Sequence, residues 1–381
     1  MSKKIVRTLF ILSLTLLLVA VGIFGYYSGY NYVTAQNERL NSLSRQIELE
    51  GKSPITEGTR DSIEIYIPRN SDMDDITDIL SEAGLVNNKI AFKILSKING
   101  FDGNFRSGTH YLLDNMSYDE MMLILTSKPD PITITFPEGL SYSQVKERMK
   151  KAGMRFDEDI LDEMMKRPNL FIDYDFMQEI PFYPERDWMM QGYLWPDTYQ
   201  FDVNESEENI LRKFFDNTER KLRNGNYYER AEIIGMTLDQ AVTLASLVQK
   251  EGPMSEMPKI GRVFINRLRQ EMPLQSCATI NYLREADGLE PVLWVRNSDL
   301  ERYQDNPYNT YGIAALPPGP INSPGTVALE GVLWPATERS WAGANSYLYF
   351  VAKGDGYNDF SKTYEEHQEK TAKYSGAQQT N

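Results

Sequence analysis

The chain has 381 residues, of which 41% are hydrophobic, so it is long enough for two or three domains with buried cores. Its formal net charge of -14 argues against a general nucleic-acid partner, because lysine and arginine neutralise nucleic-acid phosphates. The one cysteine, Cys277, excludes an intrachain disulfide framework, and His110 and His367 are too far apart in sequence to favour a zinc site. We therefore expect a mechanism without a metal ion or another cofactor.

The amino terminus carries a candidate membrane anchor. Lys3, Lys4 and Arg7 precede an uncharged apolar run that is close to the length a bilayer core requires. The positive-inside rule predicts that residues 1–8 are cytoplasmic, that residues 9–27 cross the cell membrane once, and that the rest of the chain is extracytoplasmic. A cleaved signal peptide is the alternative, but the small-residue cleavage pattern is not evident after the apolar run.

A polar segment at residues 28–61 has no sustained apolar periodicity, and glycine and proline interrupt its second half. This composition predicts a stalk that is partly helical near Asn37 to Glu50. Residues 62–130 then predict a small α+β subdomain. An alternating strand at Ile63–Ile67 precedes two helices, a second strand and a third helix that opens with a Ser117–Glu120 capping box.

A larger domain is predicted at residues 131–373. We expect it to have a mixed α/β fold, so that the fold class of the whole chain is α+β. Its expected elements include a strand at Ile132–Phe136, a compact aromatic segment at Tyr193–Gln200, a helix capped by Ser255, a strand at Tyr347–Ala352 that is central to the sheet, and a terminal helix at Thr363–Lys373. Residues 374–381 are expected to be a frayed tail.

Within this domain, residues 236–253 predict an amphipathic helix with a capping box at its start and a Gly-Pro stop at its end. Helical spacing places Glu251 on the same apolar face as Leu244, Leu247 and Val248. Partial burial and the negative end of the helix dipole both disfavour the anion, so we expect a raised pKa for Glu251. Such an acid can protonate a glycosidic oxygen, although a glutamate at a helix end is also commonly solvated or salt-bridged.

Several ordered motifs carry a resemblance to a known family. They are Tyr193–Tyr199, Ala245–Glu251, Val263–Leu268, Leu274–Gln275, Tyr308–Tyr311, Leu316–Ile321 and Tyr347–Ala352. In their order and spacing they resemble the YceG-like family of endolytic murein transglycosylases, over most of residues 131–370. The region 62–130 resembles the LysM-like subdomain that precedes the catalytic part in this family. The alternative interpretation of region 62–130 is a small packing module that binds no ligand of its own.

The resemblance implies an endolytic lytic transglycosylase of peptidoglycan. Glu251 would protonate the oxygen between N-acetylmuramic acid and N-acetylglucosamine in nascent glycan strands. The same side chain would then take the proton from the muramyl C6 hydroxyl and leave a 1,6-anhydromuramyl end. A membrane-tethered enzyme of this kind implies the cell-wall synthases as partners.

Seven further residues are candidates for substrate binding. They are Asp197, Asn266, Arg267, Gln275, Tyr308, Asn309 and Tyr311. Aromatic rings stack on sugars and amides pair with sugar hydroxyls, so the segment 308–311 and the proline-rich loop 316–325 fit a cleft wall, unless the loop is only structural. Asp197 has an alternative role as a turn cap. Arg267, which with Asn266 is expected to leave the buried face of its helix, has an alternative role in a structural ion pair.

The sequence departs from the family pattern at four positions. Gln191 and Gln249 stand where glutamate is common, Cys277 stands where many relatives have aspartate, and Asn358 stands where some have histidine. Their effect on activity is open.

Two other functions remain open. A hydrolase of muramidase type needs a second carboxylate near Glu251, for which Asp197, Glu256 and Asp305 are candidates. The other alternative is a non-catalytic peptidoglycan-binding scaffold for cell-wall synthases.

Overall fold

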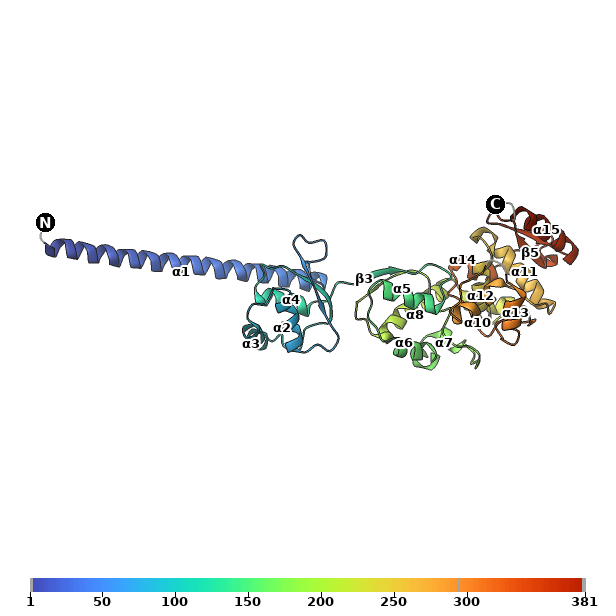
Figure 1. The fold of residues 1–381 in the computed structure, drawn as a ribbon, viewed down its shortest axis with the longest axis horizontal. Helices are drawn as coiled ribbons and strands as arrows, with labels where there is room; N and C mark the ends of the chain where they lie inside the picture. Colours follow the sequence, from blue (N-terminus) through green and yellow to red (C-terminus); the bar gives the residue numbers. More distant parts are fainter. Residues whose placement is uncertain (1–2, 293–294, 379–381) are drawn as a thin grey trace. The chain divides into compact units, whose positions relative to one another are not determined.

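The computed structural model describes residues 3–292 and 295–378 (Figure 1). The fold is mixed α+β and mostly helical, and the sheets of the described residues are two-stranded. The chain divides into two compact units. The amino-terminal unit comprises the residues up to 132 together with 202–204, and the carboxyl-terminal unit comprises residues 133–201 and those from 205 onward.

The first helix, α1 (Lys3–Glu50), is 48 residues long and about 72 Å in length at 1.5 Å per residue (Figure 1). Its part from Ser13 onward is long and apolar enough to cross a membrane, and no residue of its apolar window is buried. The helix continues without interruption to Glu50, so it includes the stretch from Asn37 to Glu50 that the sequence predicts as partly helical and extends over residues 28–36 as well. Its polar sequence before Gly51 contains no proline, and nothing there stops the helix. Residues 1–2 of the predicted cytoplasmic tail lie outside the described residues.

The rest of the amino-terminal unit follows the predicted order of strand, two helices, strand and helix. Its elements are β1 (Ile63–Ile67), α2 (Met73–Glu82), α3 (Lys89–Ile98), β2 (Gly108–Leu112) and α4 (Tyr118–Thr126). The two strands pair antiparallel, and the predicted Ser117–Glu120 capping box is present. The end of α1 belongs to this core, because Leu43 is buried in it and Arg39 Nε lies 3.2 Å from the Glu120 carboxylate.

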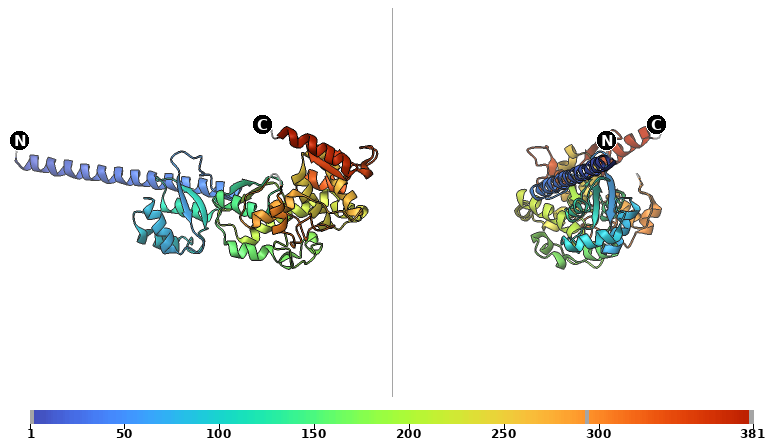
Figure 2. Two further views of the ribbon diagram at one scale, coloured as in Figure 1. Left: turned by 45° about the vertical axis from the view of Figure 1, so that its right-hand side comes forward. Right: turned by 90° about the vertical axis from the view of Figure 1, so that its left-hand side faces the viewer.

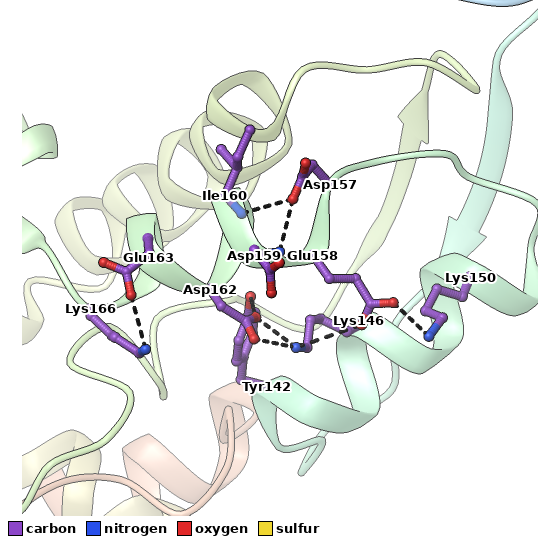
Figure 3. A network of polar contacts seen from close by, with 10 residues as sticks. All are labelled: Tyr142, Lys146, Lys150, Asp157, Glu158, Asp159, Ile160, Asp162, Glu163 and Lys166. Carbon is purple, nitrogen blue, oxygen red and sulfur yellow. Dashed lines mark hydrogen bonds and ion pairs between the residues drawn. The ribbon is translucent and has the colours of Figure 1, made fainter.

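The carboxyl-terminal unit opens with a strand and a set of helices. They are β3 (Ile132–Thr135), α5 (Tyr142–Lys151), α6 (Glu158–Met165), η1 (Pro168–Phe171), α7 (Asp175–Gln178), β4 (Thr198–Phe201), α8 (Glu207–Asn224) and α9 (Tyr227–Ile234), and β3 pairs with β4. Figure 3 shows the polar contacts that connect α5 to α6. Lys146 Nζ lies 2.6 Å from Asp162 Oδ1, which also accepts a 2.6 Å hydrogen bond from the Tyr142 hydroxyl, and Lys150 pairs with Glu158 at 2.8 Å.

A second group of helices forms the centre of this unit. They are α10 (Leu238–Glu251), η2 (Met254–Glu256), α11 (Met257–Arg269), α12 (Cys277–Ala286), α13 (Asn297–Arg302) and α14 (Thr326–Leu333). The predicted cap at Ser255 is wrong, because Ser255 lies inside η2 and α11 begins at Met257 without a side-chain cap. Helices α10, α11 and α14 pack against one another. Glycines at 261 and 331 allow α11 and α14 to approach at backbone distance, since a Cβ on Gly261 would overlap the Gly331 carbonyl oxygen.

The chain ends in η3 (Ala344–Ser346), a hairpin of β5 (Tyr349–Ala352) and β6 (Asn358–Ser361), and α15 (Tyr364–Gln378). In Figure 2, α15 lies beside these strands, in agreement with its packing contacts. The expectation that the 347–352 strand is central to a sheet is wrong, because β5 pairs only with β6 within the described residues. The predicted tail is helical as far as Gln378, and residues 379–381 lie outside the described residues.

Candidate active site

A cleft of 1590 Å³ lies in the carboxyl-terminal unit. Most of its wall comes from the last turn of α10, helix α12, the segment 288–292, strand β5 and helix α15. The loop before α5 completes it with Gly139 and Ser141. Glu251, the last residue of α10, lines this cleft.

The surroundings of Glu251 explain its proton affinity. Leu244, Leu247 and Val248 on the preceding turns are fully buried, so the helix presents Glu251 from a packed apolar face and leaves its side chain half-buried. Burial raises the pKa of Glu251 above its ordinary value. The hydroxyl of Ser276 donates to Oε1, and this hydrogen bond together with the charge of Arg267 lowers the pKa in part. The net direction is upward, as the sequence predicts.

The end of α10 is fixed by Asn358 on β6. Its side-chain amide donates to the Glu251 carbonyl oxygen at 3.0 Å, so this carbonyl at the helix end has a partner. The backbone amide of Asn358 donates to Glu256 Oε2 at 2.8 Å. A Cβ at Gly252 would lie 2.7 Å from the Asn358 amide nitrogen, so the glycine gives this side chain room at the helix end. The predicted helix stop is confirmed, and the contact with Asn358 adds to it.

Arg267 is held beside the acid by backbone carbonyls. Its guanidinium donates to the carbonyl oxygens of Leu348 and Leu274, the latter at 2.8 Å, and lies 5.2 Å from the centre of the Tyr349 ring. Burial lowers the pKa of Arg267, and the negative charge of Glu251 opposes this effect. Arg267 lines the cleft but is 7% exposed, so the expectation that it leaves the buried face of α11 is wrong.

Gln275 and Tyr311 also line the cleft. Gln275 has a left-handed backbone with φ of 51°, and its amide donates to the Thr310 carbonyl at 2.9 Å. The Tyr311 hydroxyl lies 3.2 Å from the Cys277 sulfur, and burial raises the pKa of that thiol. Two of the predicted aromatic and amide candidates therefore meet Glu251 at the same cavity.

Four other candidates do not line the cleft. Asn266 is 3% exposed, contrary to expectation, and donates to two backbone carbonyls. Tyr308 is buried against the Tyr282 ring, and the Asn309 amide donates to the Tyr303 carbonyl.

Asp197 accepts hydrogen bonds from the Thr198 amide at 2.9 Å and the Asn217 side chain at 3.1 Å. The hydrogen bond from the Thr198 amide is the contact expected if Asp197 caps a turn, which is its alternative role. A role of the four residues in substrate binding stays a prediction.

The sequence did not identify several polar residues in or next to the cleft, among them Ser276, Lys250 and Glu285. Ser276 bonds the acid itself, Lys250 lines the wall, and Glu285 accepts hydrogen bonds from the Ser141 hydroxyl and from the Gln144 side chain. Ser276 directly follows the Leu274–Gln275 motif, which is the one sequence signal that points to it. Within the described residues, no group of three His, Cys, Asp or Glu side chains is placed to hold a metal ion.

Two of the departures from the family pattern have structural partners elsewhere in the unit. The Gln191 side chain accepts from the Tyr142 amide and donates to the Pro320 carbonyl, both at 2.9 Å. Gln249 accepts from the Gly325 amide at 2.8 Å. Both glutamines tie the loop around residue 320 to the helices of the unit.

Comparison with known proteins places this geometry in context. A model of the YceG-like family matches residues 65–373. The chain belongs to the YceG-like family. A crystal structure of a YceG-like protein from Listeria monocytogenes has 28% sequence identity and a TM-score of 0.53, and the match covers 82% of this chain and 99% of that chain.

Two relatives of this YceG-like chain carry the name endolytic murein transglycosylase. The protein of Bacillus subtilis (strain 168) is 30% identical over 343 residues, which are 86% of this chain and 89% of the relative. The protein of Streptococcus pneumoniae serotype 2 (strain D39 / NCTC 7466) is 26% identical over 384 residues, which are 96% of this chain and 65% of the relative.

Proposed function

We propose that the chain is an endolytic lytic transglycosylase that cleaves the glycan strands of peptidoglycan. Its membership of the YceG-like family and the names of its relatives support this enzyme class. The observation that carries the proposal is the Glu251 carboxyl at the cleft, with its pKa raised by burial. A group that retains its proton closer to neutral pH is suited to protonate a leaving oxygen.

The reaction needs one side chain that acts twice. Glu251 gives its proton to the glycosidic oxygen between N-acetylmuramic acid and N-acetylglucosamine as the bond from muramyl C1 to that oxygen breaks. Its carboxylate then takes the proton of the muramyl C6 hydroxyl, whose oxygen bonds to C1 and closes the 1,6-anhydro ring. Glu251 ends protonated again, and no water enters the product. Between the two steps the Ser276 hydroxyl and the Arg267 charge stabilise the carboxylate.

A hydrolase would differ by a second carboxylate that activates water. The three candidates named from the sequence, Asp197, Glu256 and Asp305, do not line the cleft. Glu285 lines it, but the Ser141 hydroxyl and the Gln144 amide already bond its carboxylate oxygens. Glu290 also lines the cleft with an exposed side chain, so attack by a hydroxyl of the substrate itself is proposed from family membership and not from the lack of a second acid.

We also propose that the enzyme is anchored in the cell membrane through its amino-terminal helix. α1 has one segment apolar enough to span a bilayer, and the cations before it favour a cytoplasmic amino terminus with residues 9–27 as the single-pass anchor. The region 62–130 is proposed as a LysM-like subdomain, and 131–373 as the catalytic domain. An extracytoplasmic cleft would act on nascent strands beside the cell-wall synthases, which are the proposed partners.

The test compares the wild-type chain with Glu251→Gln, which keeps the side-chain shape but removes the acid. We expect the variant to fold normally and to lose cleavage of defined glycan strands by at least about a hundredfold, the lower range for a general acid. Mass spectrometry of the wild-type digest should show ends that lack the elements of one water relative to hydrolysis products.

Glu285→Gln is the matched control, since it removes another cleft carboxylate. Cleavage with anhydro ends should persist in this variant. Full activity of Glu251→Gln would remove Glu251 from the mechanism, and loss of cleavage in both variants would favour a two-carboxylate hydrolase.

A further inference from the structure

The cleft extends beyond Glu251 to the carboxyl-terminal helix. Tyr364, His367, Gln368 and Thr371 of α15 line it together with Phe350 of β5. α15 packs on both strands of the hairpin that also carries Asn358, the residue that holds the end of α10. This part of the wall, the α15 arm, is therefore connected to the acid through one hairpin.

One aromatic side chain of the α15 arm is open to solvent. Tyr364 is 54% exposed, whereas the other aromatic rings that line the cleft are partly buried, namely Tyr282, Tyr311, Phe350 and His367. An exposed ring in the wall of a cavity offers a flat apolar face with a polar hydroxyl at its edge. The ring costs little entropy on binding, because it has only two side-chain torsions.

The Tyr364 ring contacts a column of planar groups formed by Arg267, Tyr349 and His367. The Arg267 guanidinium lies 5.2 Å from the Tyr349 ring centre, and the His367 ring stacks on Tyr349 at 5.2 Å and 21°. Tyr364 touches this column, with its ring centre 5.9 Å from that of Tyr349. Burial and the charge of Arg267 lower the pKa of His367, so the imidazole stacks as an uncharged ring at neutral pH. Tyr349 therefore contacts both the arginine beside the acid and the exposed tyrosine.

We infer that the α15 arm is a sugar-binding subsite in which Tyr364 stacks against a pyranose ring of the glycan strand, apart from the sugars that Glu251 acts on. This inference rests on the proposed function and adds to it an anchoring position along the strand. The carbon–hydrogen face of a sugar matches an aromatic ring, and Gln368 next to it supplies an amide for the sugar hydroxyls or N-acetyl groups. An enzyme that cuts inside a strand needs such a contact away from the cleaved bond.

The experiment measures binding rather than cleavage, so that its outcome is separate from that of the proposed mechanism. The full-length chain with Glu251→Gln is titrated in detergent micelles with purified peptidoglycan glycan oligomers of increasing length. We expect affinity to rise once the oligomer is long enough to reach Tyr364. Adding Tyr364→Ala or Tyr364→Leu should weaken binding of the long oligomers by about threefold to tenfold and leave the shortest unchanged.

Two controls keep the result interpretable. Tyr364→Phe retains the ring and should bind all lengths like the parent. Tyr357→Ala removes a tyrosine that is 48% exposed but does not line the cleft, and it should also bind like the parent. Equal affinity of the Tyr364→Leu variant and its parent for every length would overturn the inference, and so would an equal loss at all lengths. Cleavage by the Glu251→Gln background would instead contradict the proposed function.

Discussion

At the scale of single residues, opposing effects set the protonation of Glu251. Burial raises its pKa, while the Ser276 hydroxyl and the positive charge of Arg267 lower it. The first effect keeps the acid available for the leaving oxygen, and the other two keep the carboxylate available for the C6 hydroxyl. The geometry therefore serves both proton transfers with one side chain.

Ser276→Ala tests this balance through the pH dependence of kcat/KM. The free enzyme must carry a protonated Glu251, so the rate falls as pH rises through its pKa. The serine hydrogen bond stabilises the anion and thereby lowers the pKa, so its removal should raise the pKa and move the alkaline limb to higher pH by about one unit. Ser141→Ala is the control, because this serine lines the same cleft but donates to Glu285. A limb that stays in place or moves to lower pH in Ser276→Ala would contradict the assigned balance.

At the scale of elements, α11, which bears Arg267, packs closely against α14 where Gly261 meets Gly331. Gly261→Ala should destabilise the carboxyl-terminal unit, because the backbone carbonyl of Gly331 cannot move aside for the added methyl group. Overpacking costs about 1–3 kcal/mol, and the better helix propensity of alanine returns up to about 1 kcal/mol. Thermal unfolding should therefore show a lower Tm for Gly261→Ala. Gly312→Ala, where the nearest atom is 3.6 Å away, should change the Tm little. An unchanged Tm for Gly261→Ala would show that the two helices separate easily.

The elements also show which features the sequence alone can predict. The capping box of Thr237 and Gln240 and the strand-helix-helix-strand order near residue 63 follow from local patterns, and both are confirmed. The bond from Ser276 to Glu251 joins positions 25 residues apart, so no local pattern encodes it. The sequence analysis predicts a strand at Tyr347–Ala352 that is central to the sheet, whereas β5 pairs only with β6 within the described residues. In the structure, α11 and α15 pack against β5 in place of further strands, and of its four residues only Val351 is buried.

At the scale of the whole molecule, α1 combines two roles within one helix. Its apolar window has no buried residue, whereas Leu43 near its other end belongs to the core of the amino-terminal unit. A chain without residues 1–27 should therefore fold, appear in the soluble fraction and still cleave glycan strands in solution. Cell fractionation and a digest of purified strands check this expectation. Sedimentation of the truncated chain with membranes would show that another surface holds it there.

The central claim is that the substrate's own hydroxyl, and not water, completes the cleavage that Glu251 begins. The most direct measurement is a digest of purified glycan strands by the wild-type chain in water enriched in oxygen-18, followed by mass spectrometry of the new ends. We expect the new ends to be 1,6-anhydromuramyl groups that contain no oxygen-18. Reducing ends that carry oxygen-18 would contradict it.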